Sequence, residues 1–384
     1  MFNVGLQQAL TKSLTLTLNY AGTQSHFLLA SGANARGLWT NQLNPKYLVA
    51  LATVADSTGK LPILGSPATA ANVAIVQNAL PGSTLPYSSI SGPKATTTIA
   101  QTLVKFPQYS GVSDTWGNVS NISYNSLQAS LAESGFHGLT YTLNYTYSHN
   151  IGDDGTFRSG YDIPTGAISN STKAYKQSRI DRSDTTVDMT HNIAMYGLWE
   201  IPYNKAGGFI ERSLAGGWSI SSIYRFTSGT PFVPTYAGCS APPDSGTCAL
   251  DLNPAYTGNG HLVAGGYRHF KTQYIDPNAF AAPQQFGTNL STNYNKIGNA
   301  PRTAPYGLRN PYFWEDDVSL HRAFNLGFKH TTFVADITCI NVANHPTLSN
   351  PTATWDKPNS TSFGFVTGAQ ANPRDFQFGG HFNF

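Results

Sequence analysis

The chain has 384 residues and a formal net charge of +3, and only 11% of its residues are charged, against roughly 25% in ordinary soluble domains. Its 40% hydrophobic and 12% aromatic content excludes a disordered chain, and the scattered Lys and Arg residues exclude a nucleic-acid-binding protein. The longest apolar run, Tyr47–Ala55, is far shorter than the ~20 residues of a membrane-spanning helix, which leaves a secreted β protein or an outer-membrane β-barrel.

Apolar and polar residues alternate along much of the chain, which is typical of β-strands with one apolar and one polar face. Between residues 139 and 148, for example, Leu and Tyr alternate with Thr, Asn and Ser. Helical spacing is confined to a short helix expected at Asn44–Val54. The alternation predicts nine long strands, near residues 2–10, 12–21, 118–132, 136–150, 186–203, 213–229, 309–323, 326–342 and 373–384.

The links between these strands alternate strictly between short and long. The short ones are Thr11, Glu133–Phe136, Asn204–Arg212 and Phe324–Asn325. The long ones lie near 22–117, 151–185, 230–308 and 343–372. This order predicts an all-β, up-and-down antiparallel transmembrane β-barrel, whose short turns are periplasmic and whose long loops are extracellular. A soluble sandwich has no reason to place every long loop at one end.

The distribution of aromatic residues also favours the membrane. The polar side of each strand is rich in Thr, Ser, Asn and Gln, which suits a wet lumen, and the apolar side carries aromatic residues near the strand ends. Such residues form the interfacial girdles of a lipid-facing wall. The alternative is that they are ordinary core residues of a soluble β protein. The predicted membrane-interface residues are Tyr145, Tyr147, Trp199, Tyr203, Trp218 and Phe226.

The number of predicted strands indicates that the complete barrel has more strands than this sequence contains. Single-chain bacterial barrels have an even number of strands and no open edge, whereas nine is odd. We therefore expect this chain to be the C-terminal part of a larger barrel. The N-terminal segment also lacks the basic, apolar and cleavage regions of a signal peptide, so we expect the chain to be incomplete at that end.

The three cysteines predict one small disulfide loop. Cys239 and Cys248 flank a Pro-, Gly- and Ser-rich segment, and their spacing suits a disulfide formed in an oxidising compartment. Two unpaired thiols are the alternative. Cys339 lies within a strand-like run and is expected to be a small buried apolar residue.

Five segments together resemble a known family. They are FPQYSGVSDTWGNVSNISYNSLQASL (106–131), LAGGWSISSIYRFTSGTPF (214–232), YIDPNAFAAP (274–283), DITCINVANHPTLSNP (336–351) and FGFVTGAQANPRDFQFGGHFNF (363–384). In this order they resemble the C-terminal barrel region of TonB-dependent outer-membrane receptors, in particular the Oar-like receptors that carry a carboxypeptidase-regulatory-like domain. The resemblance extends over essentially all of residues 1–384.

This resemblance implies a 22-strand barrel that is closed by an N-terminal plug, and TonB-driven uptake of a large, scarce ligand. No segment matches a plug or a TonB box, so TonB would act only through a plug region outside this sequence. The chain's last aromatic residues resemble the signal by which the barrel-insertion machinery recognises its substrates. These residues are Phe376, Phe378, Phe382 and Phe384.

Motifs for catalysis or cofactor binding are missing from the sequence. There is no HExxH, CxxC or GxSxG pattern, so we predict no enzyme activity, no metal site and no cofactor. Asp316, Asp317 and Asp336 could serve as glycosidase carboxylates, but strand alternation places Asp336 on the lumen side, where an ordinary solvated charge is the simpler interpretation. His261 and His269 are expected to be exposed loop histidines.

Two hypotheses therefore remain. The first is a receptor and transporter segment in the outer membrane of a Gram-negative-type bacterium, with outer-membrane lipid, the barrel-insertion machinery and an unknown ligand as partners, and no nucleic acid. The second is a secreted or surface-attached carbohydrate-binding or adhesion protein. They differ in whether the apolar side of the strands faces lipid or a packed core.

Overall fold

The computed structural model describes residues 1–28, 38–39, 41, 43–82, 97–114, 120–152, 182–203, 216–240, 243, 248–285, 294–295, 298–326, 331–370 and 373–384. A 10-stranded sheet dominates this part of the chain. The nine long strands are β1 (Phe2–Ala9), β2 (Leu14–Leu28), β5 (Ser120–Phe136), β6 (Leu139–Gly152), β8 (His191–Glu200), β9 (Trp218–Thr227), β14 (Phe313–Asn325), β15 (Thr332–Ile340) and β18 (Asp375–Asn383).

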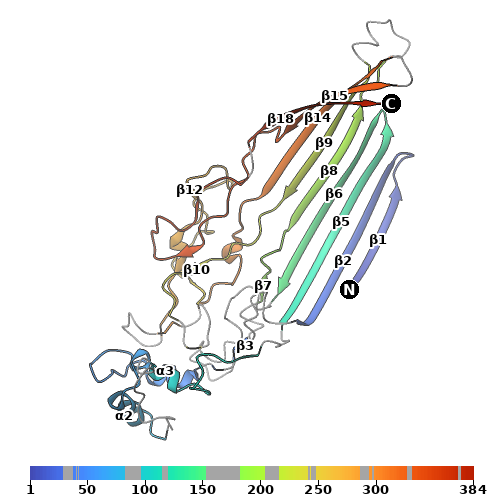
Figure 1. Cartoon of the computed structure of the whole chain (residues 1–384). Coiled ribbons are helices and arrows are strands. Elements are labelled where there is room, and N and C mark those ends of the chain that lie inside the picture. Colours follow the sequence, from blue (N-terminus) through green and yellow to red (C-terminus); the bar gives the residue numbers. More distant parts are fainter. Residues whose placement is uncertain are drawn as a thin grey trace.

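These nine strands follow one another across the sheet in chain order, and each is antiparallel to its neighbours (Figure 1). The two-residue strand β7 (Ser183–Asp184) pairs with the end of β6. The predicted all-β, up-and-down antiparallel architecture is therefore confirmed. No described helix is both long and apolar enough to cross a membrane.

Several predicted strand boundaries were wrong. The predicted short links Glu133–Phe136 and Phe324–Asn325 belong to β5 and β14, and two further boundaries differ for distinct physical reasons. β2 continues to Leu28, seven residues beyond the predicted end. The apolar alternation stops at Gly22 and Gln24, but the backbone hydrogen bonds between β2 and β5 continue past these residues. β8 begins only at His191. The segment before it forms a turn in which the Asp188 backbone N–H donates to the Thr185 carbonyl at 2.9 Å.

The described parts of the long links lie beyond one end of the sheet, and the C-terminus lies at the opposite, short-turn end (Figure 1). At the short-turn end, Gly217 has a φ of 76°, and a side chain there would meet the Ala323 carbonyl of β14, since an added Cβ would lie 2.5 Å from that oxygen. A glycine is required at this point so that the chain can enter β9 close against its neighbour.

The link between β2 and β5 contains more helix than the sequence predicted. The expected helix at Asn44–Val54 is α1 (Pro45–Ala50), which begins where the Asn44 side chain accepts the Lys46 N–H. Also present are η1 (Ile63–Gly65), α2 (Ala70–Ala79), α3 (Ile99–Thr102) and the pair β3 (Leu38–Trp39) and β4 (Ser113–Asp114). We call these elements the helical loop module. Its core is Leu43, Leu48, Leu51, Ala52, Ile63, Leu64, Ala68, Val73, Val76, Ile99, Ala100 and Val104.

The link between β9 and β14 and the link between β15 and β18 pack together as a second unit, here called the loop layer (residues 228–312 and 341–374). Strand β10 (Thr235–Tyr236) pairs with β16 (Thr354–Trp355), and β12 (Thr272–Gln273) pairs with β17 (Phe365–Val366), so both pairings join one link to the other. Within the first link, β11 (Asp251–Leu252) pairs with β13 (Phe280–Ala281). The 3-10 turns η4 (Pro277–Ala279) and η5 (Pro305–Gly307) complete it.

The sheet is open in the structure. β1 and β18 lie at its two edges and do not pair with each other among the described residues. Every residue of β1 and of β18 is exposed. Each edge therefore presents a row of backbone donors and acceptors that a further strand could use.

Candidate functional site: the two faces of the sheet and the loop layer

The strand register places most apolar side chains on one side of the sheet, here called the apolar face, whereas Tyr196, Leu198 and Ile223 lie on the other side. Residues directly opposite each other on paired strands project to the same side, so the register can be followed from strand to strand. Leu143, for example, lies opposite Leu131 on β5 and Met195 on β8. One continuous face thus includes Val4, Leu6, Leu16, Leu18, Leu127, Leu131, Leu139, Tyr141, Leu143, Ile193, Met195, Ile220, Tyr224, Val318, Leu320, Ile337 and Phe378.

The opposite side, here called the polar face, is divided into two chemically different halves. On β1, β2, β5 and β6 it carries Ser, Thr, Asn and Gln with no charged residue at any described position. The later strands add the charged residues Glu200, Arg225, Glu315, Asp317, Asp336 and Asp375. Hydrogen bonds such as Ser221 Oγ to His321 Nε2 at 2.9 Å link neighbouring strands across this face.

Near the loop end, aromatic residues on the apolar face contact each other across strands. Tyr145 and Tyr147 of β6 flank His191 of β8, and the Tyr145 hydroxyl lies 2.9 Å from His191 Nδ1. Further along, Phe226 of β9 packs against Tyr312, with ring centroids 5.9 Å apart. Three of the predicted membrane-interface residues, Tyr145, Tyr147 and Phe226, therefore lie together with partners that the sequence did not single out.

A second aromatic group lies at the short-turn end of the same face. Trp199 of β8 and Trp218 of β9 belong to it by register. On the next strands, Phe324 packs against Phe333 at 6.2 Å between ring centroids, and Phe333 packs against Phe382 at 4.9 Å. Tyr203, which follows β8, is exposed. Trp199, Tyr203, Trp218 and Phe226 thus lie at or near strand ends. Tyr145 and Tyr147 lie in the middle of β6, level with the loop end of β8.

The spacing of these two groups suits a bilayer. β9 has 10 residues, with Trp218 at its short-turn end and Phe226 near its loop end. A tilted transmembrane strand needs about 9–11 residues, and barrel walls carry an apolar band ~25 Å tall between two aromatic girdles. The length of β9 therefore matches one membrane crossing, with an aromatic residue at each interface.

The four C-terminal phenylalanines lie on the apolar face of the edge strand β18 or directly after it. Phe376, Phe378, Phe382 and Phe384 are 54%, 77%, 55% and 96% exposed. Phe382 packs against Phe333 of β15 and against Phe384. The strand thus presents alternating aromatic side chains beside a free backbone edge, which is the combination that recognition by strand addition uses.

A charged cluster ties the loop layer to the loop end of β6. Arg309 Nη2 donates to Asp188 Oδ2 at 2.6 Å and to Asp184 Oδ2 at 3.0 Å. Its Nη1 donates to the backbone carbonyls of Asp188 and Gly229. The Asp188 carboxylate is fully buried and accepts the Asn150 N–H with its other oxygen. The guanidinium therefore compensates a buried negative charge and connects three separate segments.

The same two carboxylates and His149 are the one group of potential metal ligands in the part of the chain that the structure describes. His149 Nε2 lies 3.6 Å from Asp184 Oδ1, and its Nδ1 lies 3.7 Å from Asp188 Oδ1. Because Arg309 already donates hydrogen bonds to both carboxylates and offsets one of their two negative charges, the cluster is better suited to ion pairing than to binding a cation. Its chemistry is that of a structural latch.

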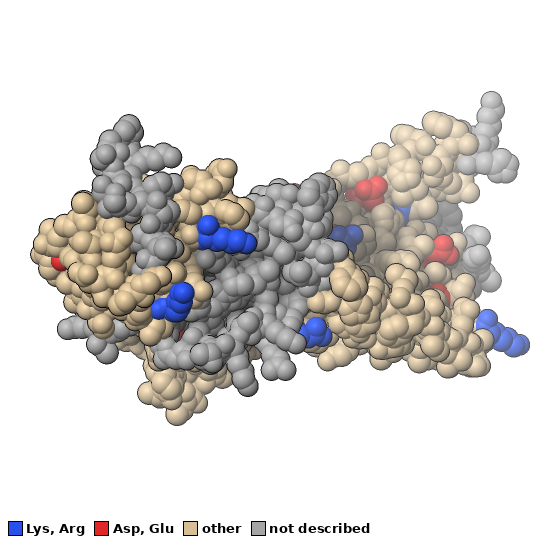
Figure 2. Space-filling model, turned by 90° about the horizontal axis from the view of Figure 1, so that it is seen from below, with Lys and Arg blue, Asp and Glu red and all other residues tan. Residues whose placement is uncertain are grey.

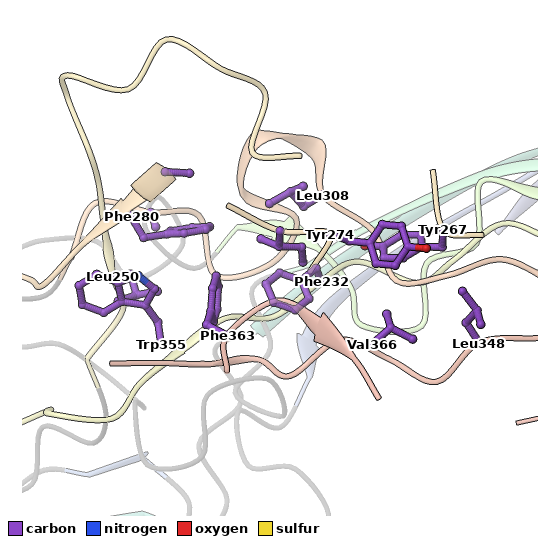
Figure 3. Close-up of a cluster of buried hydrophobic side chains, with 13 residues drawn as sticks. Phe232, Leu250, Tyr267, Tyr274, Phe280, Leu308, Leu348, Trp355, Phe363 and Val366 are labelled. Atoms are coloured by element: carbon purple, nitrogen blue, oxygen red, sulfur yellow. The ribbon is translucent and has the colours of Figure 1, made fainter. Parts of the chain in front are cut away.

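The interior of the loop layer is an aromatic core (Figure 3). Phe363 of the second link packs edge-to-face against Phe232 and Phe280 of the first, at 5.9 and 5.5 Å between ring centroids. Trp355 is buried and donates its indole N–H to the Pro277 carbonyl at 2.8 Å. Fully buried aromatic side chains of this kind are each worth roughly 2–3 kcal/mol, so the two links hold each other in place.

Cys239 and Cys248 are joined by a disulfide in this layer, with their Cα atoms 5.6 Å apart.

Burial raises the pKa of the Tyr267 hydroxyl in the loop layer, and the nearby Tyr274 adds to that effect. Cys339 is a half-buried free thiol on the apolar face, opposite Val318. In the helical loop module, hydrogen bonds from Ser66, Thr58 and the Lys60 backbone lower the pKa of the Asp56 carboxyl.

Charged residues are few on the surface seen from the loop end. In Figure 2 the basic residues (Lys and Arg) and the acidic residues (Asp and Glu) are scattered singly among other residues and form no patch of one sign. Of the two histidines expected to be exposed loop residues, His269 is exposed and His261 is half-buried. Burial lowers the pKa of His261.

The sequence did not reveal Arg309, Asp184, Asp188 or His149 as members of one cluster. His149 lies in β6, Asp184 and Asp188 lie before β8, and Arg309 lies before β14. Their spacing in the sequence matches no motif. Arg322 could have been found, because it is a cation at an apolar position of the alternating pattern in β14.

A family model described as an outer membrane beta barrel domain matches residues 1–377 of the chain. These residues include all of the sheet except most of β18. No curated protein matches the sequence.

Proposed function

The chain belongs to the outer membrane beta barrel domain family and is an outer-membrane protein, and from that premise we propose that it supplies the C-terminal strands of a TonB-dependent receptor. Its role would be uptake of a large, scarce ligand, in the manner of the Oar-like receptors that its motifs resemble. The proposed role is transport and not catalysis.

The observation that carries this proposal is the construction of the long links. The described parts of the links after β2, β9 and β15 lie beyond one end of the sheet (Figure 1), and they contain folded cores: one in the link after β2, and one shared by the links after β9 and β15. Rigid loops on a rigid scaffold are the usual way in which proteins present binding residues. A passive pore needs no such layer, whereas a receptor for a large ligand does.

The open sheet supports the proposal that further strands complete the barrel. Membrane barrels cannot leave backbone groups unpaired in lipid, and both β1 and β18 have a free edge among the described residues. We propose that the remaining strands of a 22-strand barrel pair with these edges. A plug region, through which TonB would act, would belong to that remainder.

The carboxylates give no support to an enzyme. Asp316 projects from the apolar face and Asp317 from the polar face, because they are neighbours on one strand. Asp316 accepts the Ala343 N–H, and Asp317 accepts the Asn341 N–H at 2.9 Å. Each carboxylate is thus occupied at the loop end of β15. The secreted or adhesion alternative would need the apolar face to be covered by a second layer, and the family match favours lipid instead.

Uptake can be tested without knowledge of the ligand. Cells that lack the gene, cells that lack TonB and cells that lack both are grown on a complex mixture of peptides and glycans, and depletion of the medium is followed by mass spectrometry. We expect the same compounds to persist in all three strains, with no additive effect. If they persist in the gene deletion but are consumed without TonB, the protein is a passive channel.

A further inference from the structure

We propose that His149 makes the latch between the sheet and the loop layer sensitive to pH. The latch consists of Arg309, Asp184 and Asp188. A protonated imidazole at position 149 tightens it, and a neutral imidazole leaves it weaker, so the loop layer is held more firmly in acidic surroundings. This regulation concerns the loop end of the sheet and does not depend on TonB-driven uptake.

The two carboxylates of the latch lie between two basic groups. Arg309 Nη2 binds their Oδ2 atoms, at 3.0 Å for Asp184 and 2.6 Å for Asp188. The His149 ring lies at their Oδ1 atoms, with Nε2 3.6 Å from that of Asp184 and Nδ1 3.7 Å from that of Asp188. Each ring nitrogen therefore faces a different carboxylate, and each carboxylate faces the guanidinium with one oxygen and the imidazole with the other.

The charge of this cluster is unbalanced while the imidazole is neutral. The two carboxylates carry two negative charges, and Arg309 offsets one of them. The Asp188 carboxylate is fully buried, where an uncompensated charge is costly. Its Oδ1 accepts the Asn150 N–H, which supplies a dipole and not a charge. A proton on His149 supplies the missing positive charge on the side of the carboxylates that Arg309 does not reach.

A histidine is suited to this task because its imidazole ordinarily gains its charge between about pH 8 and about pH 5. The neutral ring has one N–H and can donate to one carboxylate, whereas the protonated ring donates from both nitrogens. The distances of 3.6 and 3.7 Å are longer than hydrogen bonds, so the ring has room to move closer when it becomes charged. The His149 side chain is 45% exposed, which gives protons access from solvent.

The other groups around His149 do not supply the same response. On β5, Asn125 lies opposite His149 and is uncharged. In the loop layer, Arg302 donates to a backbone carbonyl at the end of β6 and keeps its charge throughout this pH range. His191 of β8 also titrates, but its Nδ1 lies 2.9 Å from the Tyr145 hydroxyl, and it forms no ion pair with a carboxylate in the described part of the chain.

The direction of the pH effect follows from which form of the imidazole the latch favours. The closed latch favours protonated His149, so the added stability is present at low pH and is lost as the pH rises and the ring loses its proton. Protonation of the carboxylates has the opposite effect, but it occurs near and below the ordinary Asp pKa of about 3.9. Between about pH 8 and about pH 5.5 the histidine therefore determines the response.

The test uses this protein, purified in a neutral detergent, and measures hydrogen exchange at about pH 8 and about pH 5.5, corrected for intrinsic rates. We expect exchange in segments 182–190 and 302–309 to be about threefold slower at the lower pH, as for a half-exposed ion pair, and exchange in β14 to be unchanged. In His149→Gln both segments should exchange at both pH values as the unaltered protein does at about pH 8. In His149→Arg, which carries a permanent charge, they should be slow at both.

The matched control is His191→Gln, which removes a histidine of the neighbouring strand that has no carboxylate partner among the described residues. It should keep the full pH response. A response that persists in His149→Gln, or one that disappears in His191→Gln, would overturn the proposal. Loss of protection on addition of EDTA would also overturn it, because the cluster would then be held by a metal ion. If His149→Gln fails to fold, a pH response in His149→Arg equal to that of the unaltered protein would contradict the proposal in the same way.

Discussion

Arg309 and Asp188 are 121 residues apart in sequence, yet the guanidinium donates a 2.6 Å hydrogen bond to the buried carboxylate. Arg309 belongs to the link between β9 and β14, and Asp188 lies just before β8. This contact fixes the loop layer to the loop end of the sheet. Segment 302–309 adds two further contacts, since Arg302 donates to the Gly152 carbonyl and Thr303 donates to the Asp184 carbonyl.

We predict that Arg309→Ala loosens the loop layer without unfolding the sheet. The change leaves the buried Asp188 carboxylate without its cation, and a charged hydrogen bond of this kind is worth about 1.5–3 kcal/mol. Hydrogen exchange should become faster in segments 182–190 and 302–309 and remain unchanged in β14. Arg268→Ala, which removes an exposed side chain of the same link, should change neither segment. Unaltered exchange in Arg309→Ala would show that the latch does not hold the layer.

We predict that the two faces of β6 meet different surroundings. Leu143 is on the apolar face, and its neighbour Thr142 is on the polar face. Leu143→Cys should be protected from a water-soluble maleimide in intact outer membranes, and a nitroxide at that position should be broadened by oxygen. Thr142→Cys should react with the maleimide. Reversed reactivity would place the polar face against lipid.

We predict that loss of the disulfide between Cys239 and Cys248 destabilises the loop layer locally. In the chain-entropy model, closing a loop of this size is worth about 2–3 kcal/mol. Cys239→Ser combined with Cys248→Ser should make the loop layer more sensitive to limited proteolysis, while the amount of protein in the outer membrane stays the same. The single change Cys339→Ser, at the free thiol, is the control. Equal protease resistance of the double variant would show that the aromatic core alone suffices.

We predict that the C-terminal phenylalanines are needed for membrane insertion. Phe384→Ser, or deletion of Phe382–Phe384, should lower the amount of this protein in the outer membrane while its synthesis is unchanged. The reason is that alternate side chains give specificity when an edge strand is recognised through its backbone. Asn383→Ser, on the polar face of the same strand, should insert normally. Normal outer-membrane levels of the Phe384 variant would show that the residue only packs at the strand end.

We predict that the helical loop module depends on the charge of Asp56. Its carboxylate accepts hydrogen bonds from Ser66 Oγ and Thr58 Oγ1, both at 2.7 Å, and these bonds lower its pKa. A lowered pKa in the folded state gives a stabilisation that is fully present above the ordinary Asp pKa of about 3.9 and is lost as the pH falls toward the folded value.

Asp56→Asn should therefore increase hydrogen exchange of residues 57–66 at pH 7, after correction for intrinsic rates. The difference from the unaltered protein should shrink as the pH falls below about 4. Asp251→Asn, a carboxylate of the separate loop layer, is the control and should leave residues 57–66 unaffected. A difference that is constant with pH would mean that side-chain shape, not charge, supports the module.

The period-two pattern of the sequence determined the sheet. Alternation along each strand fixes which residues share a face, and short links force neighbouring strands to be antiparallel, so strand number, order and the two faces followed from local information. The face on which Tyr145, Tyr147, Trp199, Trp218 and Phe226 lie followed as well, because it depends only on alternation. Strand ends themselves were less certain, since the ladder of β2 continues where its apolar pattern stops.

The tertiary structure alone decided how the long links are organised. Their cores join residues such as Phe232 and Phe363, which are far apart in sequence and follow no period. The pairing of Arg309 with Asp184 and Asp188 likewise depends on where irregular segments cross the end of the sheet. Periodic elements carry their partners' positions in their own sequence, whereas irregular loops are placed by packing against distant segments, and no local pattern encodes that placement.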